Sequence, residues 1–113
     1  MNWLPLTSEQ QFRDLLIESN DHSVAVFKHS TRCSVSLMAK RSLEFSWQSV
    51  AGGMPVYLLD LIQYRDISNL IAETLNVTHQ SPQLIIIKNG KTVYHASHSA
   101  IDAQEAVESV LQK

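Results

Sequence analysis

The sequence predicts one α/β domain, spanning residues 1–113, in which helices flank a mixed four-stranded sheet and an extra helix precedes the first strand. Short apolar runs rich in β-branched residues alternate along the chain with stretches whose apolar residues recur at helical spacing. The last two apolar runs flank Asn89–Gly90, a dipeptide that strongly favours a hairpin. With 113 residues and 44% hydrophobic content, the chain has the size and the apolar content of a single packed domain.

The predicted elements follow the order α-β-α-β-α-β-β-α. Apolar residues at helical spacing predict helices over residues 7–19, 34–47, 65–76 and 101–111, the first of them capped by Thr7 or Ser8. Strands are predicted over residues 23–29, 55–60, 83–88 and 91–96. The helix between the first two strands implies a right-handed parallel crossover, whereas the last two strands form an antiparallel hairpin. Apart from its first helix, this order is that of a thioredoxin-like domain.

Composition and charge exclude several functional classes. The net charge of -2, without a run of basic residues, argues against a nucleic-acid-binding domain. No apolar stretch approaches the ~18 residues of a spanning helix, and the first ten residues lack the features of a signal peptide. Cys33 is the only cysteine, which excludes an internal disulfide and a zinc site built on C-x-x-C. We therefore expect a cytoplasmic protein in a reducing compartment that binds neither nucleic acid nor membrane.

Cys33 is the first candidate for chemistry. It follows the first predicted strand and precedes the next helix, at the carboxyl edge where open α/β sheets place their sites. Free backbone N–H groups at a helix start favour the thiolate, which is the reactive form of cysteine, and Arg32 adds a neighbouring cation. The alternative is a buried, unreactive cysteine. We favour the reactive thiol because of its strand–turn–helix context.

Two further positions complete this candidate site. Ser36 stands three residues after Cys33, where a C-x-x-C redox pair has its second thiol, and we expect its hydroxyl to donate a hydrogen bond to the thiolate. Pro82 directly precedes the strand over 83–88. In a thioredoxin-like domain a cis-proline here lies opposite the active cysteine. We therefore expect Ser81–Pro82 to be cis, with Ser81 offering backbone groups to an extended substrate. The alternative is a proline that only opens an edge strand.

Four stretches carry a resemblance to a known family: "FKHSTRCSVS", "YLLDLIQYRDISN", "HQSPQLIIIKNG" and "ASHSAI". Over residues 24–101 the chain resembles the monothiol bacilliredoxins, thioredoxin-like proteins of bacteria that make bacillithiol. The resemblance implies a single thiolate that removes bacillithiol from mixed disulfides on oxidised proteins. Cys33 would be the nucleophile, and Ser36 would be the serine that ends the family's C-P-[IV]-S motif. Ser34 departs from this motif, because the family usually has proline there, and it supplies an extra backbone N–H.

Chain direction adds candidates for substrate binding at the same sheet edge. Tyr64 and Arg65 follow the second strand, where Arg65 would receive the carboxylates of a thiol cofactor. His98 follows the returning strand of the hairpin. The alternatives are a packing role for Tyr64, a solvated helix start for Arg65 and an ordinary loop position for His98. The full set of predicted binding residues is Arg32, Ser34, Ser81, Pro82, Tyr64, Arg65 and His98.

Because His95 and His98 form an H-x-x-H without a third ligand, we expect no metal site. The tryptophans and methionines are interpreted as packing groups.

These observations predict a monothiol thiol–disulfide oxidoreductase that acts through Cys33. Its expected cofactor is a low-molecular-weight thiol, with bacillithiol implied by the resemblance, and no metal is expected. The expected partners are S-thiolated cytoplasmic proteins, and we expect a monomer. Two alternatives stay open. One is an iron–sulfur carrier that holds a cluster between two subunits through Cys33 and an external thiol. The other is a non-catalytic thioredoxin-like module that binds partners through the proline face.

Overall fold

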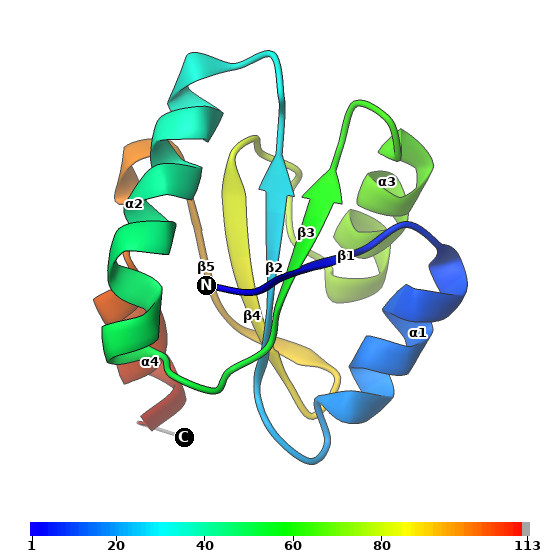
Figure 1. The fold of residues 1–113 in the computed structure, drawn as a ribbon. Helices are drawn as coiled ribbons and strands as arrows, with labels where there is room; N and C mark the ends of the chain where they lie inside the picture. Colours follow the sequence, from blue (N-terminus) through cyan, green and yellow to red (C-terminus); the bar gives the residue numbers. More distant parts are fainter. Residues whose placement is uncertain (112–113) are drawn as a thin grey trace.

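The computed structural model describes residues 1–111 and shows a five-stranded mixed sheet with helices on both faces (Figure 1). The strands lie in the order β1-β3-β2-β4-β5. β1, β2 and β3 run parallel, and β4 and β5 form the antiparallel part. The strands are β1 (Trp3–Pro5), β2 (Val24–His29), β3 (Val56–Asp60), β4 (Gln83–Lys88) and β5 (Lys91–Ser97). The helices are α1 (Glu9–Glu18), α2 (Ser34–Val50), α3 (Arg65–Leu75), the 3-10 turn η1 (His98–Ala100) and α4 (Ala103–Leu111).

The predicted thioredoxin-like class is confirmed, with one difference: the sheet has five strands rather than four. The additional strand, β1, pairs in parallel with β3, from Trp3 beside Val56 to Pro5 beside Leu58. Three residues that end in proline are too short to show a period-2 pattern, so the sequence carries no signal for this strand. Its pairing covers the edge of β3 that the four-stranded prediction left open.

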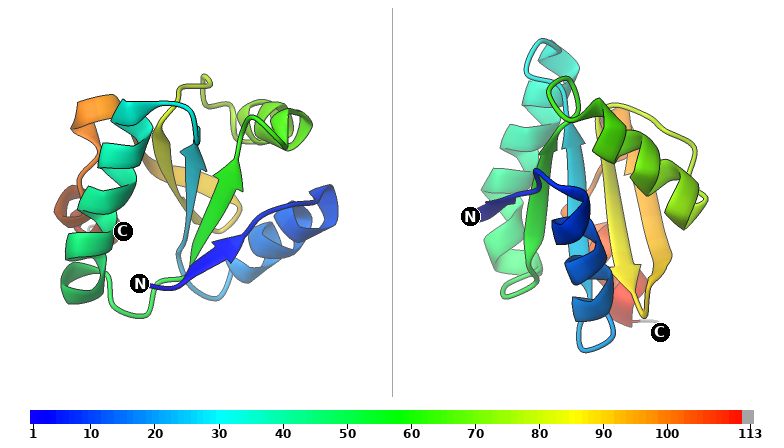
Figure 2. Two further views of the ribbon diagram at one scale, coloured as in Figure 1. Left: turned by 45° about the horizontal axis from the view of Figure 1, so that its top comes forward. Right: turned by 90° about the vertical axis from the view of Figure 1, so that its right-hand side faces the viewer.

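The core lies in two layers on opposite faces of the sheet, and β2 contributes to both. Figure 2 shows α1 and α3 on one side and α2 and α4 on the other. Val24 and Val26 pack toward α1 and α3, whereas Ala25 and Phe27 pack toward α2 and α4. All six residues of β2 are buried, as expected for a central strand covered on both faces. The buried central strand of the sheet therefore leads directly into the turn that carries Cys33.

The helix ends follow local capping chemistry. Ser8 is the cap of α1, because its hydroxyl accepts a hydrogen bond from the Gln11 N–H. Asp102 caps α4 by accepting hydrogen bonds from two backbone N–H groups, so this helix begins at Ala103 rather than at residue 101. Within residues 1–111, no helix has the length and apolar character required to cross a membrane.

Candidate active site

Cys33 is the N-cap residue of α2, and its backbone is extended, with φ -114 and ψ 121. Its N–H donates to the carbonyl of Ser30 at 3.3 Å, which closes a tight turn between β2 and the helix. The thiol is half-buried and makes no capping hydrogen bond. An N-cap side chain lies beside the free N–H groups of the first helical turn, where negative charge is stabilised. The local geometry therefore suits an accessible thiolate.

Ser36 lies at the third position of α2 and is fully buried. Its Oγ accepts a hydrogen bond from the Ser30 N–H at 3.0 Å and lies 2.6 Å from Nδ1 of His29. Burial, together with the charge of Lys40, lowers the pKa of His29 against the opposing charges of Asp60 and Glu44. The short separation is that of a hydrogen bond between the Ser36 hydroxyl and the imidazole, in which the tautomer of His29 determines the donor.

This arrangement corrects the expected partner of Ser36. Among residues 1–111, no hydrogen bond joins Ser36 to Cys33. The reason is that His29 ends β2 on the face covered by α2, stacked on Phe27 with ring centroids 5.9 Å apart, and so lies within reach of the first helical turn. Ser36 thus fastens the turn before Cys33 to the end of β2 through its contacts with His29 and Ser30.

Ser36→Ala should lower the free energy of unfolding by about 1–3 kcal/mol, because it leaves the His29 ring nitrogen and the Ser30 N–H without their partner in a buried place. Urea denaturation measures the change. Ser34→Ala, at an exposed position two residues earlier, is the control and should change stability by less than about 0.5 kcal/mol. Equal effects of the two substitutions would show that the buried hydrogen bonds of Ser36 contribute nothing.

The Ser81–Pro82 peptide bond is cis, which confirms that prediction. Gln83, the next residue, is paired with Lys28 of β2, so Pro82 lies at the end of β2 that leads to Cys33. The carbonyl of Pro82 accepts a hydrogen bond from the His98 N–H at 3.0 Å. Ser81 is half-buried, next to the buried proline ring. The sequence-predicted proline and the predicted His98 therefore meet at the cysteine edge of the sheet.

The other predicted binding residues lie at or just before helix starts at this same edge. Arg32 and Ser34, on either side of Cys33, are both exposed. Tyr64 precedes α3 and is half-buried against the core between the sheet and α1 and α3, which matches its packing alternative. Arg65 is exposed as the first residue of α3. The loop before α3 is held to β2 by a hydrogen bond from the Leu61 N–H to the His29 carbonyl, 3.0 Å long.

An apolar hollow of about 280 Å³ borders the start of α2 and was missed by sequence reasoning. Met38 was interpreted as a packing residue, but 70% of it is exposed, and Val35 is 46% exposed. Helical spacing alone could not show that Met38 and Val35 are exposed. The buried face of α2 does not include them, because it is formed by Ser36, Ala39, Leu43 and Trp47. The hollow lies between α2 and η1 and is lined by Val35, Met38, Ala39, Ser42, His98, Ser99 and Ile101.

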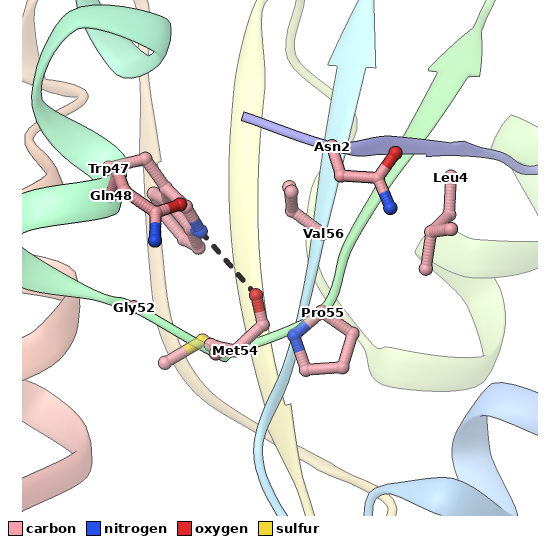
Figure 3. A pocket seen from close by; sticks show the side chains of 9 residues that line it. Asn2, Leu4, Trp47, Gln48, Gly52, Met54, Pro55 and Val56 are labelled. Carbon is pink, nitrogen blue, oxygen red and sulfur yellow. Dashed lines mark hydrogen bonds between the residues drawn. The ribbon is translucent and has the colours of Figure 1, made fainter.

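A second cavity, of about 300 Å³, lies at the other end of α2, where β3 begins (Figure 3). Trp47 lines it and donates a hydrogen bond from Nε1 to the carbonyl of Met54 at 3.4 Å. Among residues 1–111, no titratable side chain lines this cavity. Within the described part of the chain, no three His, Cys, Asp or Glu side chains are grouped so as to hold a metal ion. His95 lies on β5 and His98 in η1.

A buried polar cluster around Lys28 lies on the opposite face of β2 from Phe27 and His29. Lys28 is 0% exposed, and its Nζ lies 3.1 Å from the Ser68 carbonyl and 3.3 Å from Nδ1 of His79. Burial lowers the pKa of Lys28 to about 8. Burial lowers the pKa of His79 as well, with smaller effects from the charges of Lys28 and Arg65.

Replacing Lys28 by methionine should reveal the energetic cost of this buried ammonium through its pH dependence. The folded-state pKa of about 8 lies below the 10.5 of an unperturbed lysine, so the unfolded chain binds more protons between these pH values. Relative to Lys28→Met, the wild-type protein should therefore gain stability as the pH rises from 8 to 10.5, by up to about 3 kcal/mol. Denaturation across this range measures it, with Lys91→Met on the exposed hairpin as the baseline. If the difference in stability between the wild type and Lys28→Met does not change with pH, the buried charge is contradicted.

Comparison with known proteins adds a family and a fold. The sequence model of the family described as "Monothiol bacilliredoxin BrxC" matches residues 4–106. A candidate oxidoreductase with a thioredoxin fold is 32% identical, with a TM-score of 0.81 over 94% of this chain and 91% of the other. Thioredoxin from Fasciola hepatica is 17% identical, with a TM-score of 0.70 over 96% and 97% of the two chains. Thioredoxin from Trypanosoma brucei brucei is 16% identical, with a TM-score of 0.74 over 98% and 89%.

Proposed function

Because the chain belongs to the monothiol bacilliredoxin family, we propose that it removes a bacillithiol-like low-molecular-weight thiol from mixed disulfides on cytoplasmic proteins. The family and the thioredoxin fold make it a thiol oxidoreductase. The observation that carries the specific proposal is the position of Cys33. The only thiol of the chain caps α2 at the sheet edge where the cis-proline lies. We further propose that the protein acts as a monomer.

The reaction is a thiol–disulfide exchange at Cys33. The Cys33 thiolate attacks the low-molecular-weight sulfur of the mixed disulfide, and a new S–S bond forms as the old one breaks. The electron pair leaves on the sulfur of the target protein, which takes up a proton and is thereby reduced. Cys33 is now oxidised, in a mixed disulfide with the low-molecular-weight thiol. Since the chain has one cysteine, a second thiol molecule or a partner protein must reduce it.

The residues around the thiol have proposed roles in binding. Ser81 offers backbone groups to an extended segment of the target, next to the cis-proline ring. Arg32 and Arg65, both exposed, would receive carboxylates of the low-molecular-weight thiol. Ser34 supplies a free N–H at the first position of α2. Supporting these roles, Arg32 and Ser34 are exposed on either side of Cys33, and Arg65 is exposed at the start of α3, where donors and cations suit an anionic thiol cofactor.

Intact-mass spectrometry tests the proposal directly. The reduced protein is mixed with one substrate protein carrying bacillithiol, glutathione or cysteine on a single thiol. We expect the adduct mass to move to Cys33 while an equal amount of substrate thiol becomes free, fastest for bacillithiol. Absence of any adduct on Cys33 would refute the proposed reaction. Transfer that is fastest from another thiol would refute only the bacillithiol preference.

A further inference from the structure

Lys28 joins three segments that carry the proposed site. It lies on β2, which leads through the turn at Ser30 to Cys33. Its Nζ donates to the carbonyl of Ser68 in α3 and to the imidazole of His79, in the segment that leads to Ser81–Pro82. Because an ammonium group only donates, both contacts are hydrogen bonds from Lys28. One buried side chain therefore links the cysteine strand, α3 and the cis-proline segment.

The electrostatic surroundings of Lys28 do not explain the burial of its charge. None of the ion pairs within residues 1–111 includes Lys28. The polar groups around it are the Ser68 carbonyl from α3 and the His79 ring, and Arg65 adds a second positive charge near that ring. An ammonium ion buried without a carboxylate is costly, and an apolar side chain of similar volume is often neutral or stabilising in such a place. A role other than stability is therefore indicated.

The cis-proline segment is held at two neighbouring points. Gln83, paired with Lys28 across β2 and β4, donates from Nε2 to the carbonyl of Thr78 at 3.1 Å. Lys28 holds the next residue, His79, whose Nδ1 also lies 3.3 Å from the hydroxyl of Ser68. Both anchors are side chains of the two paired central strands. They determine where the segment before Pro82 lies relative to the strand that ends beside Cys33.

We propose that Lys28 is a positioning residue, which holds the segment before Ser81–Pro82 at the separation from Cys33 that an S-thiolated protein requires. The role rests on the proposed function. It affects only reactions in which the substrate contacts both the thiol and the proline segment. A small reagent that meets the thiol alone does not depend on it.

Two reactions of Lys28→Met separate positioning from other effects. We expect kcat/KM for dethiolation of an S-thiolated protein to fall about 10- to 100-fold, the scale on which a misplaced binding group acts. The rate of Cys33 alkylation by iodoacetamide should stay within about twofold of wild type, because alkylation requires no contact with Ser81. Lys91→Met, on the hairpin away from both segments, should leave both rates unchanged.

His79→Phe removes the same contact from the other side. His79→Phe should lower kcat/KM for dethiolation about as much as Lys28→Met does. The double variant should have a kcat/KM no lower than that of either single variant, because both substitutions remove one shared interaction. If Lys28→Met does not fold, His79→Phe at its half-buried site carries the test.

Three outcomes would overturn the positioning role alone: unchanged dethiolation in Lys28→Met, alkylation that falls in parallel with dethiolation, or fully additive losses in the double variant. A wild-type protein without dethiolation activity would instead overturn the proposed function and, with it, this role.

Discussion

Cys33→Ser should reduce dethiolation to the rate of the uncatalysed exchange, the largest effect expected of any substitution in this chain. A serine hydroxyl is not ionised at neutral pH and does not attack a disulfide sulfur, and no second cysteine can replace the thiol. The assay is release of free thiol from an S-thiolated substrate protein, followed with and without the variant. Retention of the wild-type rate would remove Cys33 from the mechanism and with it the whole proposed function.

The same substitution should leave the fold intact or stabilise it. Cys33 is the N-cap of α2 and makes no capping hydrogen bond, whereas serine is among the best N-cap residues. We expect Cys33→Ser to raise the free energy of unfolding by about 0.5–1 kcal/mol. Ser49→Ala, near the end of the same helix, is the control for both activity and stability. Loss of activity together with a stabilised fold would assign the effect to chemistry rather than to unfolding.

Ser36→Cys should create an intramolecular disulfide with Cys33. An N-cap side chain and the third helical residue are the positions that meet in a capping box, and residue 36 occupies that third position. Residues three apart on a helix have Cβ atoms roughly 5–6 Å apart, against ~3.8 Å in a disulfide, so closure requires a small adjustment at the helix start. The half-buried Cys33 leaves the bond accessible to a dithiol reductase.

Mild oxidation tests this prediction. The Ser36→Cys protein should lose two thiols without gaining the mass of a second chain, and a dithiol reductase should restore both. Before oxidation it should be less stable than wild type by about 1–3 kcal/mol, because cysteine replaces the hydroxyl that binds His29 and Ser30. Ser49→Cys supplies a second thiol far along α2 and should form only intermolecular dimers. Dimers alone from Ser36→Cys would show that residues 33 and 36 are not arranged as a redox pair.

Local patterns in the sequence were sufficient for much of this fold. Asn89 and Gly90 both adopt positive φ, 54° and 73°, as the hairpin signal requires, and the strands on either side pair as predicted. The place of Cys33 between a buried strand and a helix follows from the same kind of pattern. Helix and strand periodicities, caps and turn residues act over a few positions, so they can be recognised without knowing the partners across the sheet.

Contacts between distant segments decided the rest. β1 exists as a strand only because β3 pairs with it, and Met38 is exposed because other residues of α2 face the sheet. Ser36 binds His29 rather than the thiolate, although all three residues lie within one short stretch, because the direction of β2 relative to α2 selects the partner. Lys28 reaches His79, 51 positions away. Such partners depend on how faces of the sheet are covered, which a one-dimensional pattern of residue types does not contain.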